Sequence, residues 1–130
     1  MKIYSFEKLE CWQKARHLAV WTYGVTQKFP PEEKFGMVSQ MRRAAISIAS
    51  NLAEGSSRKT AKDKNHFSTI AYSSTVELLN DLIIANDLKF ITDENYLEGR
   101  EKIEYQTFLI AQLRATQQTS PKPSKPPKLS

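Results

Sequence analysis

Hydrophobic residues recur along this chain at intervals of three and four, which is the spacing that lines one face of an α-helix. No segment shows the sustained alternation of apolar and polar residues that is typical of a β-strand. The periodic stretches are long, and the breaks between them are short. The pattern therefore predicts an all-α fold, an antiparallel up-down-up-down four-helix bundle.

A proline break separates the first two predicted helices. The first is expected from about Phe6 to Lys28, because Pro30 and Pro31 lack the amide donor that helix continuation needs. The second is expected to begin near Pro31 and to end at Gly55, which suits a left-handed C-terminal cap. The inward-facing positions predicted for these two helices are Trp12, Ala15, Leu18, Ala19, Thr22, Val25, Phe29, Val38, Met41, Ala45, Ile48 and Leu52.

Capping residues mark the starts of the other two helices. Thr60, followed by Asp63 three residues later, is expected to cap the third helix, and Thr92 to cap the fourth. The third helix is expected to end between residues 86 and 89. Gly99, inside the fourth, either permits two backbones to approach closely or is tolerated at a cost of about 1 kcal/mol. The inward positions are Phe67, Ala71, Ser74, Leu78, Leu82, Ala85, Leu88, Tyr96, Ile103, Ile110 and Leu113.

The C-terminal residues differ in composition from the rest of the chain. Prolines and lysines make up most of residues 121–128, and residues 117–130 contain little to bury, so we expect a disordered basic tail after a bundle domain of residues 1–116. The three tail lysines supply +3 of the formal net charge of +5. The bundle is therefore only mildly basic, and an argument for nucleic-acid binding depends on where its charges cluster.

The composition is that of a folded protein, with 40% hydrophobic and 25% charged residues. No apolar stretch reaches the roughly 18 residues that a membrane span requires, and the N-terminus lacks the features of a signal peptide. The single cysteine cannot form an intramolecular disulfide. We therefore expect a cytoplasmic protein that contacts no membrane.

The sequence contains no recognisable combination of catalytic residues. Cys11 and His17 are six residues apart and so lie on different faces of a helix. There is no glycine-rich phosphate loop and no pair of residues at metal-ligand spacing, so we expect neither cofactor nor metal. Glu54 and Glu77 form a conceivable carboxylate pair across two helices, but a bundle this small offers no sugar cleft. We expect a protein that is not an enzyme.

A polar stripe follows one side of the second helix through Gln40, Arg43, Ser47, Asn51 and Glu54. It is either a solvated face or a surface with partners. Serine and asparagine are poor choices for a merely exposed helix interior, and a carboxylate at the C-terminal end of a helix needs a partner. Arg58, or Arg43 of a neighbouring chain, is a candidate partner for Glu54. Glu77 of the third helix is either semi-buried and paired, which we favour, or simply exposed.

A basic cluster lies between the second and third helices. Residues 58–64 carry four cations and one acid, a formal charge of +3, and Arg42 and Arg43 lie on the preceding helix. The cluster serves either phosphate contact or solubility. No groove-reading motif is present, so binding would be to the phosphate backbone and would weaken with salt. The candidate nucleic-acid-binding residues are Arg42, Arg43, Arg58, Lys59, Lys62 and Lys64.

Several of these segments together resemble a known family, the four-helix bundle proteins encoded in intervening sequences of bacterial 23S rRNA genes. The resemblance covers roughly residues 5–113 and departs from the family at Ala49, where a kinking proline is common. It is carried by Phe6–Ala15, Phe29-Pro30, Glu33, Phe35-Gly36, Ser39–Ile48, Ser50–Gly55, Ser74 and Glu77.

This resemblance implies a homo-oligomer, a pentamer, with a basic surface and no enzymatic activity. The family is also similar to the accessory variability proteins of diversity-generating retroelements, which implies binding to RNA or DNA and to a reverse transcriptase. Trp21 and Tyr23, which lie off the inward line, are then expected at a subunit interface. The alternative is a structural or protein-interaction oligomer that does not itself bind nucleic acid. The residues expected to build the oligomer are Gln40, Ser47, Asn51, Glu54 and Glu77.

Overall fold

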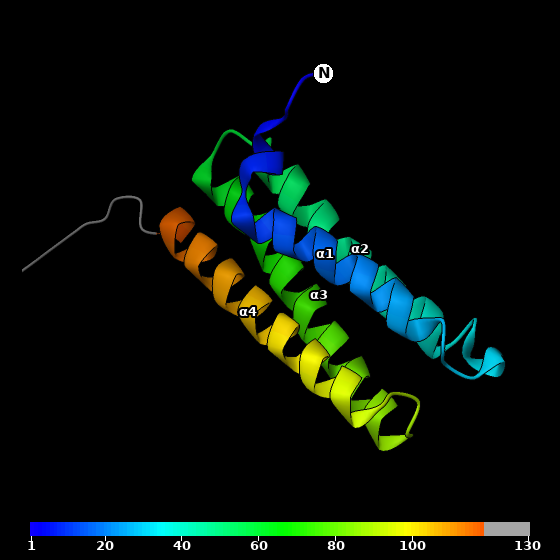
Figure 1. The fold of residues 1–130 in the computed structure, drawn as a ribbon. Coiled ribbons are helices and arrows are strands. Elements are labelled where there is room, and N and C mark those ends of the chain that lie inside the picture. Colours follow the sequence, from blue (N-terminus) through cyan, green and yellow to red (C-terminus); the bar gives the residue numbers. More distant parts are fainter. Residues whose placement is uncertain (119–130) are drawn as a thin grey trace, which may run out of the picture.

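The computed structural model describes residues 1–118, and within them the fold is all-helical (Figure 1). The four-helix bundle predicted from the sequence is confirmed. The elements are the 3-10 helices η1 (Ser5–Lys8) and η2 (Pro31–Glu33), and the α-helices α1 (Glu10–Thr26), α2 (Met37–Ser56), α3 (Ala61–Asp87) and α4 (Asp93–Gln118). The predicted tail lies outside the described residues from 119 onward, and its first two residues, Gln117 and Gln118, belong to α4.

Successive helices run in opposite directions, and α2 and α3 pack on each other along their lengths (Figure 1). As a result, three segments meet at one end of the molecule: η1, the turn between α2 and α3, and the C-terminal end of α4. We call this the amino-terminal end of the bundle. The opposite end carries η2 and the turn between α3 and α4.

Most of the predicted inward positions lie in the core, which also contains Cys11, Ala44, Ile91 and Leu109. Leu18, Met41, Ile48, Leu78 and Ile103 are all at most 2% exposed. Trp12, Phe67, Tyr96 and Leu113 are only partly buried. The prediction for Leu88 is wrong, because this residue follows the last turn of α3 and is 52% exposed. Of the predicted inward positions, Ala15, Ala19, Thr22, Val25, Phe29, Val38, Ala45, Leu52, Ala71, Ser74, Leu82, Ala85 and Ile110 are also buried.

Helix starts were harder to predict than helix centres. The first α-helix begins at Glu10 rather than Phe6, because the extended backbone of Leu9 separates it from η1. The second begins at Met37 rather than Pro31, because Gly36 has φ −108° and ψ −107°, outside the helical region. The threonine caps are confirmed: Thr60 Oγ1 accepts from the Asp63 amide and Thr92 Oγ1 from the Asn95 amide, each at 3.1 Å.

Two glycines allow helices to approach closely. The left-handed cap predicted at Gly55 is wrong, because this residue lies inside α2 and has no positive φ. A Cβ atom there would lie 3.0 Å from Cβ of Phe67 on α3. At Gly99 a Cβ atom would lie 2.5 Å from the Trp21 ring. The close-approach alternative therefore holds for Gly99, and Trp21 packs between α1 and α4 of its own chain.

Candidate nucleic-acid and assembly surfaces

The basic turn, which we define as Arg58–Lys64, lies at the amino-terminal end of the bundle. Arg58 and Lys59 precede α3, and Lys62 and Lys64 lie in its first turn. The Thr60 cap fixes the backbone of this segment. Arg58, Lys59 and Lys62 are exposed, whereas Lys64 is partly buried. The structure therefore presents three of the four cations to solvent.

Arg58 is held by groups of its own chain. Its guanidinium donates to Glu54 Oε2 at 2.6 Å and lies over the Phe67 ring, 4.7 Å from the ring centre. A carboxylate near the C-terminal end of a helix needs a cationic partner, and for Glu54 this partner is Arg58 of the same chain. Because this pair is exposed, it stabilises the fold by at most about 1 kcal/mol. Lys59 and Lys62 remain as exposed cations without an ion pair among residues 1–118.

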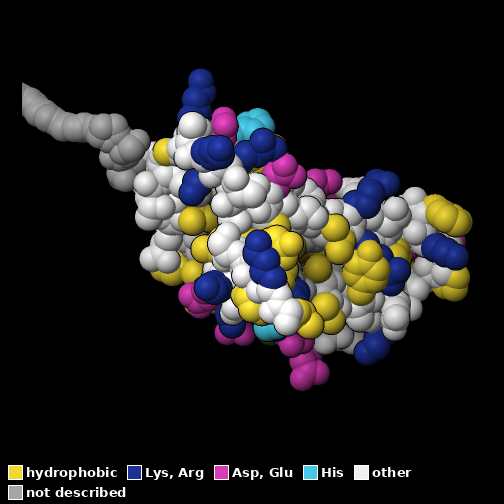
Figure 2. Space-filling view, turned by 90° about the horizontal axis from the view of Figure 1, so that it is seen from above, with side chains coloured by type: hydrophobic (Ala, Val, Ile, Leu, Met, Phe, Trp, Pro, Cys, Tyr) yellow, Lys and Arg dark blue, Asp and Glu magenta, His cyan; other side chains and the backbone are white. Residues whose placement is uncertain are grey.

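Arg42 and Arg43 lie far from the basic turn on a single chain. At a rise of about 1.5 Å per residue, the stretch of α2 beyond Arg43 is roughly 20 Å long. Lys and Arg side chains are correspondingly spread over the face shown in Figure 2, with Asp and Glu between them. The structure therefore does not unite the six candidate cations into one patch.

Arg42 has a structural role at the end of α1. Its Nε donates to Thr26 Oγ1 at 3.0 Å, and a terminal nitrogen donates to the Tyr23 carbonyl at 3.3 Å. The guanidinium also lies 4.4 Å from the centre of the Tyr23 ring. A cation is favourable at a helix C-terminus, where carbonyl groups lack helical partners. Arg42 thus joins α2 to α1, whereas Arg43 is exposed.

Two residues of the polar stripe of α2, Gln40 and Ser47, contact α3, and Asn51 bonds within α2. Gln40 Nε2 donates to Asp81 Oδ1 at 2.9 Å, and the hydroxyls of Ser47 and Ser74 lie 2.8 Å apart. Asn51 Nδ2 donates to the Ser47 carbonyl at 2.9 Å and to its hydroxyl at 3.1 Å. These residues are therefore more than a solvated face.

Glu77 does not follow this pattern. It is exposed, and its carboxylate has no hydrogen bond or ion pair within residues 1–118. The expectation that Glu77 is semi-buried and paired is wrong. Its charge nevertheless reaches the neighbouring carboxyl group of Asp81.

Asp81 is the residue that sequence reasoning missed. It is 1% exposed, and Oδ1 accepts from Gln40 and, at 3.3 Å, from Asn80, whereas Oδ2 has no partner among the described residues. Burial raises the pKa of Asp81, as does the charge of Glu77, and the hydrogen bonds from Asn80 and Gln40 oppose the rise. The sequence held a signal, because Asp81 falls three residues after Leu78 and four before Ala85 on the inward line.

The cysteine lies in the core and is chemically inert. Gln106 Nε2 donates to the Cys11 carbonyl at 3.0 Å, and Cys11 is 6% exposed. Burial, together with the charge of Glu10, raises the pKa of the thiol to about 12. No group of three His, Cys, Asp or Glu side chains within residues 1–118 is placed to hold a metal ion. Every helix in that range is too short or too polar to cross a bilayer.

Comparison with known proteins identifies the family but not the activity. A search of curated proteins finds no match. The bundle is similar to the crystal structure of a protein of unknown function from the S23 ribosomal protein family of Bacteroides thetaiotaomicron, with 20% identity and a TM-score of 0.73 over 80% of this chain and 97% of that one. At this identity the likeness shows a shared fold. The profile of the 23S rRNA-intervening sequence proteins matches residues 7–112, and the chain therefore belongs to that family.

Proposed function

We propose that this protein is a non-enzymatic, homo-oligomeric accessory protein of the cytoplasm that binds RNA or DNA through the phosphate backbone. The observation that carries the proposal is the basic turn, in which Lys59 and Lys62 stand exposed and unpaired among the described residues on a backbone ordered by the Thr60 cap. Cations on an ordered backbone attract phosphates without reading bases.

Oligomerisation supplies what one chain lacks. A single basic turn offers few phosphate contacts, whereas a closed ring repeats it in every subunit and gains avidity from the repetition. We propose a pentamer, in keeping with the family resemblance. Its partner protein in this proposal is a reverse transcriptase of a diversity-generating retroelement, which docks on the assembled ring.

The side of the bundle next to the Gln40–Asp81 contact suits assembly. Ile84 lies on α3 and Leu88 directly follows it with helical backbone, and they come three and seven residues after Asp81, so they lie on the same side of the helix. They are 40% and 52% exposed, respectively. Apolar side chains beside a polar contact are typical of the core and rim of a protein interface. This surface supports the oligomer, with or without nucleic acid.

A salt titration tests the nucleic-acid part of the proposal. Binding constants are measured by anisotropy of labelled RNA and DNA at rising NaCl concentration. The slope of log K against log[NaCl] reports the number of phosphate contacts, because each contact on duplex DNA contributes about 0.9 to its magnitude. The double variant Lys59→Ala/Lys62→Ala should bind more weakly, with a slope lower by up to about 2 per subunit. The control Lys28→Ala/Lys34→Ala removes the same charge at the opposite end of the bundle and should keep the slope.

The alternative is a structural or protein-interaction oligomer that does not bind nucleic acid directly. It is favoured by the Gln40–Asp81 and Ser47–Ser74 contacts, which order the face that carries Ile84 and Leu88. Light scattering that shows a pentamer, together with binding that is absent or indifferent to salt, would select this alternative. A monomer at all concentrations would contradict both. A neighbouring gene for a reverse transcriptase that co-purifies would support the retroelement partner.

A further inference from the structure

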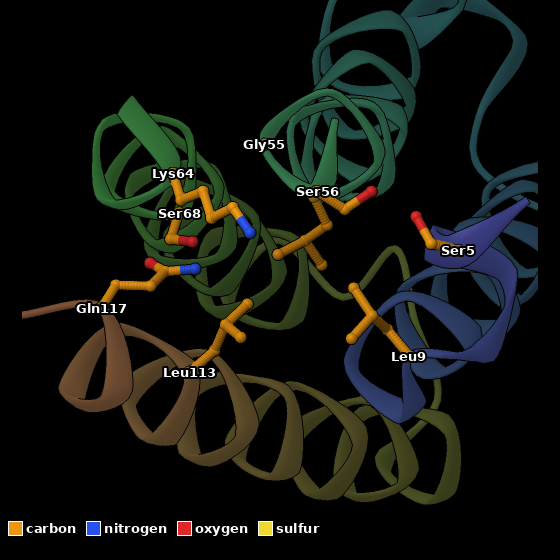
Figure 3. A pocket seen from close by; sticks show the side chains of 9 residues that line it. Ser5, Leu9, Gly55, Ser56, Lys64, Ser68, Leu113 and Gln117 are labelled. Atoms are coloured by element: carbon orange, nitrogen blue, oxygen red, sulfur yellow. The ribbon is translucent and has the colours of Figure 1, made fainter. Parts of the chain in front are cut away.

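A pocket of about 220 Å³ opens at the amino-terminal end of the bundle, where η1, the end of α2, the start of α3 and the end of α4 converge (Figure 3). Leu9 and Leu113 line it with apolar surface, and Lys64, Ser68 and Gln117 line it with polar groups. At about 30 Å³ per water molecule, its volume has room for a small polyatomic ion and the group attached to it.

Lys64 is the charged residue among the described residues that line this pocket. It is partly buried, in contrast to Lys59 and Lys62, and Figure 3 shows its ammonium group directed into the pocket. It forms no ion pair within residues 1–118. Gly55 lies across from it, and the close packing of α2 on α3 at that glycine forms the wall. The pocket therefore holds an uncompensated positive charge.

Two further polar groups face the pocket without a protein partner. Ser68 is 2% exposed, yet its hydroxyl forms no hydrogen bond with any described residue. Gln117 Oε1 is buried and likewise unpartnered among the described residues. Figure 3 shows both side chains on the same side of the pocket as Lys64, with the Gln117 amide nitrogen pointing inward. The Ser68 hydroxyl and the inward-pointing Gln117 amide nitrogen are two donors that form no hydrogen bond within residues 1–118, and the acceptor oxygens of a ligand would satisfy them.

We propose that this pocket binds a phosphate group, either free phosphate or a terminal phosphate monoester. Lys64 supplies the charge, and the Ser68 hydroxyl and the Gln117 amide donate hydrogen bonds. These donors come from two helices, and a tetrahedral anion offers oxygens in several directions at once, unlike a planar carboxylate. The site does not depend on the contacts proposed between Lys59, Lys62 and the phosphate backbone of a nucleic acid. It can therefore exist whether or not the proposed function holds.

Calorimetric titration of the full chain with inorganic phosphate, at constant ionic strength, tests the site. Saturable binding is expected, weakened at least tenfold in Lys64→Met. The control Lys62→Met removes the same charge two residues away on an exposed side chain and should bind as the parent does. Equal weakening in the two variants, or no saturable binding to the parent, would overturn the proposal. Acetate that binds as tightly as phosphate would also overturn it.

Ser68→Ala keeps the test independent of folding. Because the Ser68 hydroxyl has no protein partner, its removal should leave the melting temperature without phosphate unchanged and should weaken phosphate binding several-fold. An Ser68→Ala variant that binds phosphate as the parent does would contradict the assignment.

The source of the phosphate is settled with two oligonucleotides that differ only in a 5′-phosphate or a 5′-hydroxyl. A preference for the 5′-phosphate that disappears in Lys64→Met assigns the pocket to a nucleic-acid end. Equal affinity for both, with phosphate binding intact, assigns it to a free phosphate compound. The variant Lys59→Ala/Lys62→Ala should retain phosphate binding in either case, which separates failure of this site from failure of the proposed function.

Discussion

Gln40 on α2 and Asp81 on α3 are joined by a hydrogen bond of 2.9 Å that leaves the second carboxylate oxygen of Asp81 buried without a partner within residues 1–118. A group in this position lowers the stability of the fold when it is charged. Because the folded-state pKa of Asp81 is raised, the native state holds its proton more tightly than the unfolded chain does. The contribution of Asp81 to stability is therefore lost as the pH rises from 3.8, the ordinary pKa of an aspartate, through the raised pKa of the folded state.

We predict that Asp81→Asn raises the free energy of unfolding at pH 7 by about 1 kcal/mol, because it keeps an oxygen for Gln40 and removes the charge. The difference in melting temperature between variant and parent should grow as the pH rises through the folded-state pKa. Thermal melts from pH 4 to pH 8 measure it. A variant less stable than the parent at pH 7 would show that the free oxygen has a partner in the native assembly.

Gly99→Ala should destabilise the fold by about 1–3 kcal/mol, because the added methyl group would overlap the Trp21 ring and a Leu82 methyl group. Gly24→Ala is the matched control. A Cβ atom at residue 24 meets nothing within 4 Å, so alanine should instead stabilise α1 by about 0.5–1 kcal/mol. Urea unfolding of both variants measures the two changes in the free energy of unfolding. Equal changes in the two variants would refute the prediction.

Arg42→Ala should lower the free energy of unfolding by about 1–2 kcal/mol, because it removes the donor to the Tyr23 carbonyl and to Thr26 Oγ1. Arg43→Ala, one residue along the same helix, changes an exposed side chain and should stay within about 0.5 kcal/mol of the parent. If both variants melt at the same temperature, the contacts of Arg42 with α1 contribute nothing to stability.

Lys89→Gly should stabilise the chain by about 1 kcal/mol. Lys89 follows α3 with a φ of 61°, and its amide bonds the Asn86 carbonyl while the Phe90 amide bonds the Ala85 carbonyl. Glycine adopts this left-handed conformation without steric cost. Lys89→Ala keeps that cost and should leave the stability nearly unchanged. Differential scanning calorimetry distinguishes the two, and a loss of stability in the glycine variant would be the contrary result.

The sequence predicted the features that depend on near neighbours. The core positions of α1 to α3 follow from steps of three and four, and the caps at Thr60 and Thr92 join residues three apart. Both are local relationships, so periodicity and capping rules suffice to find them.

The missed features depend on contacts between distant segments. The sequence predicts a helix end at Gly55, because the neighbour that requires a glycine there, Phe67, comes close only when α3 is folded back on α2. Arg42 carries the same charge as Arg43, and only the position of α1 shows that one is engaged and the other exposed. The pocket residue Ser68 gave no sign in the sequence, because its lack of a partner is a property of the packed bundle.

The buried thiol of Cys11 offers a practical route to the arrangement of subunits. With its pKa at about 12 and its side chain in the core, it stays protonated and shielded from alkylating reagents at neutral pH. A second cysteine placed on the exposed side of α3, as in Val76→Cys, will then be the one that reacts with maleimide dyes or spin labels. Distances between labelled copies can be measured in this background without first removing the native sulfur.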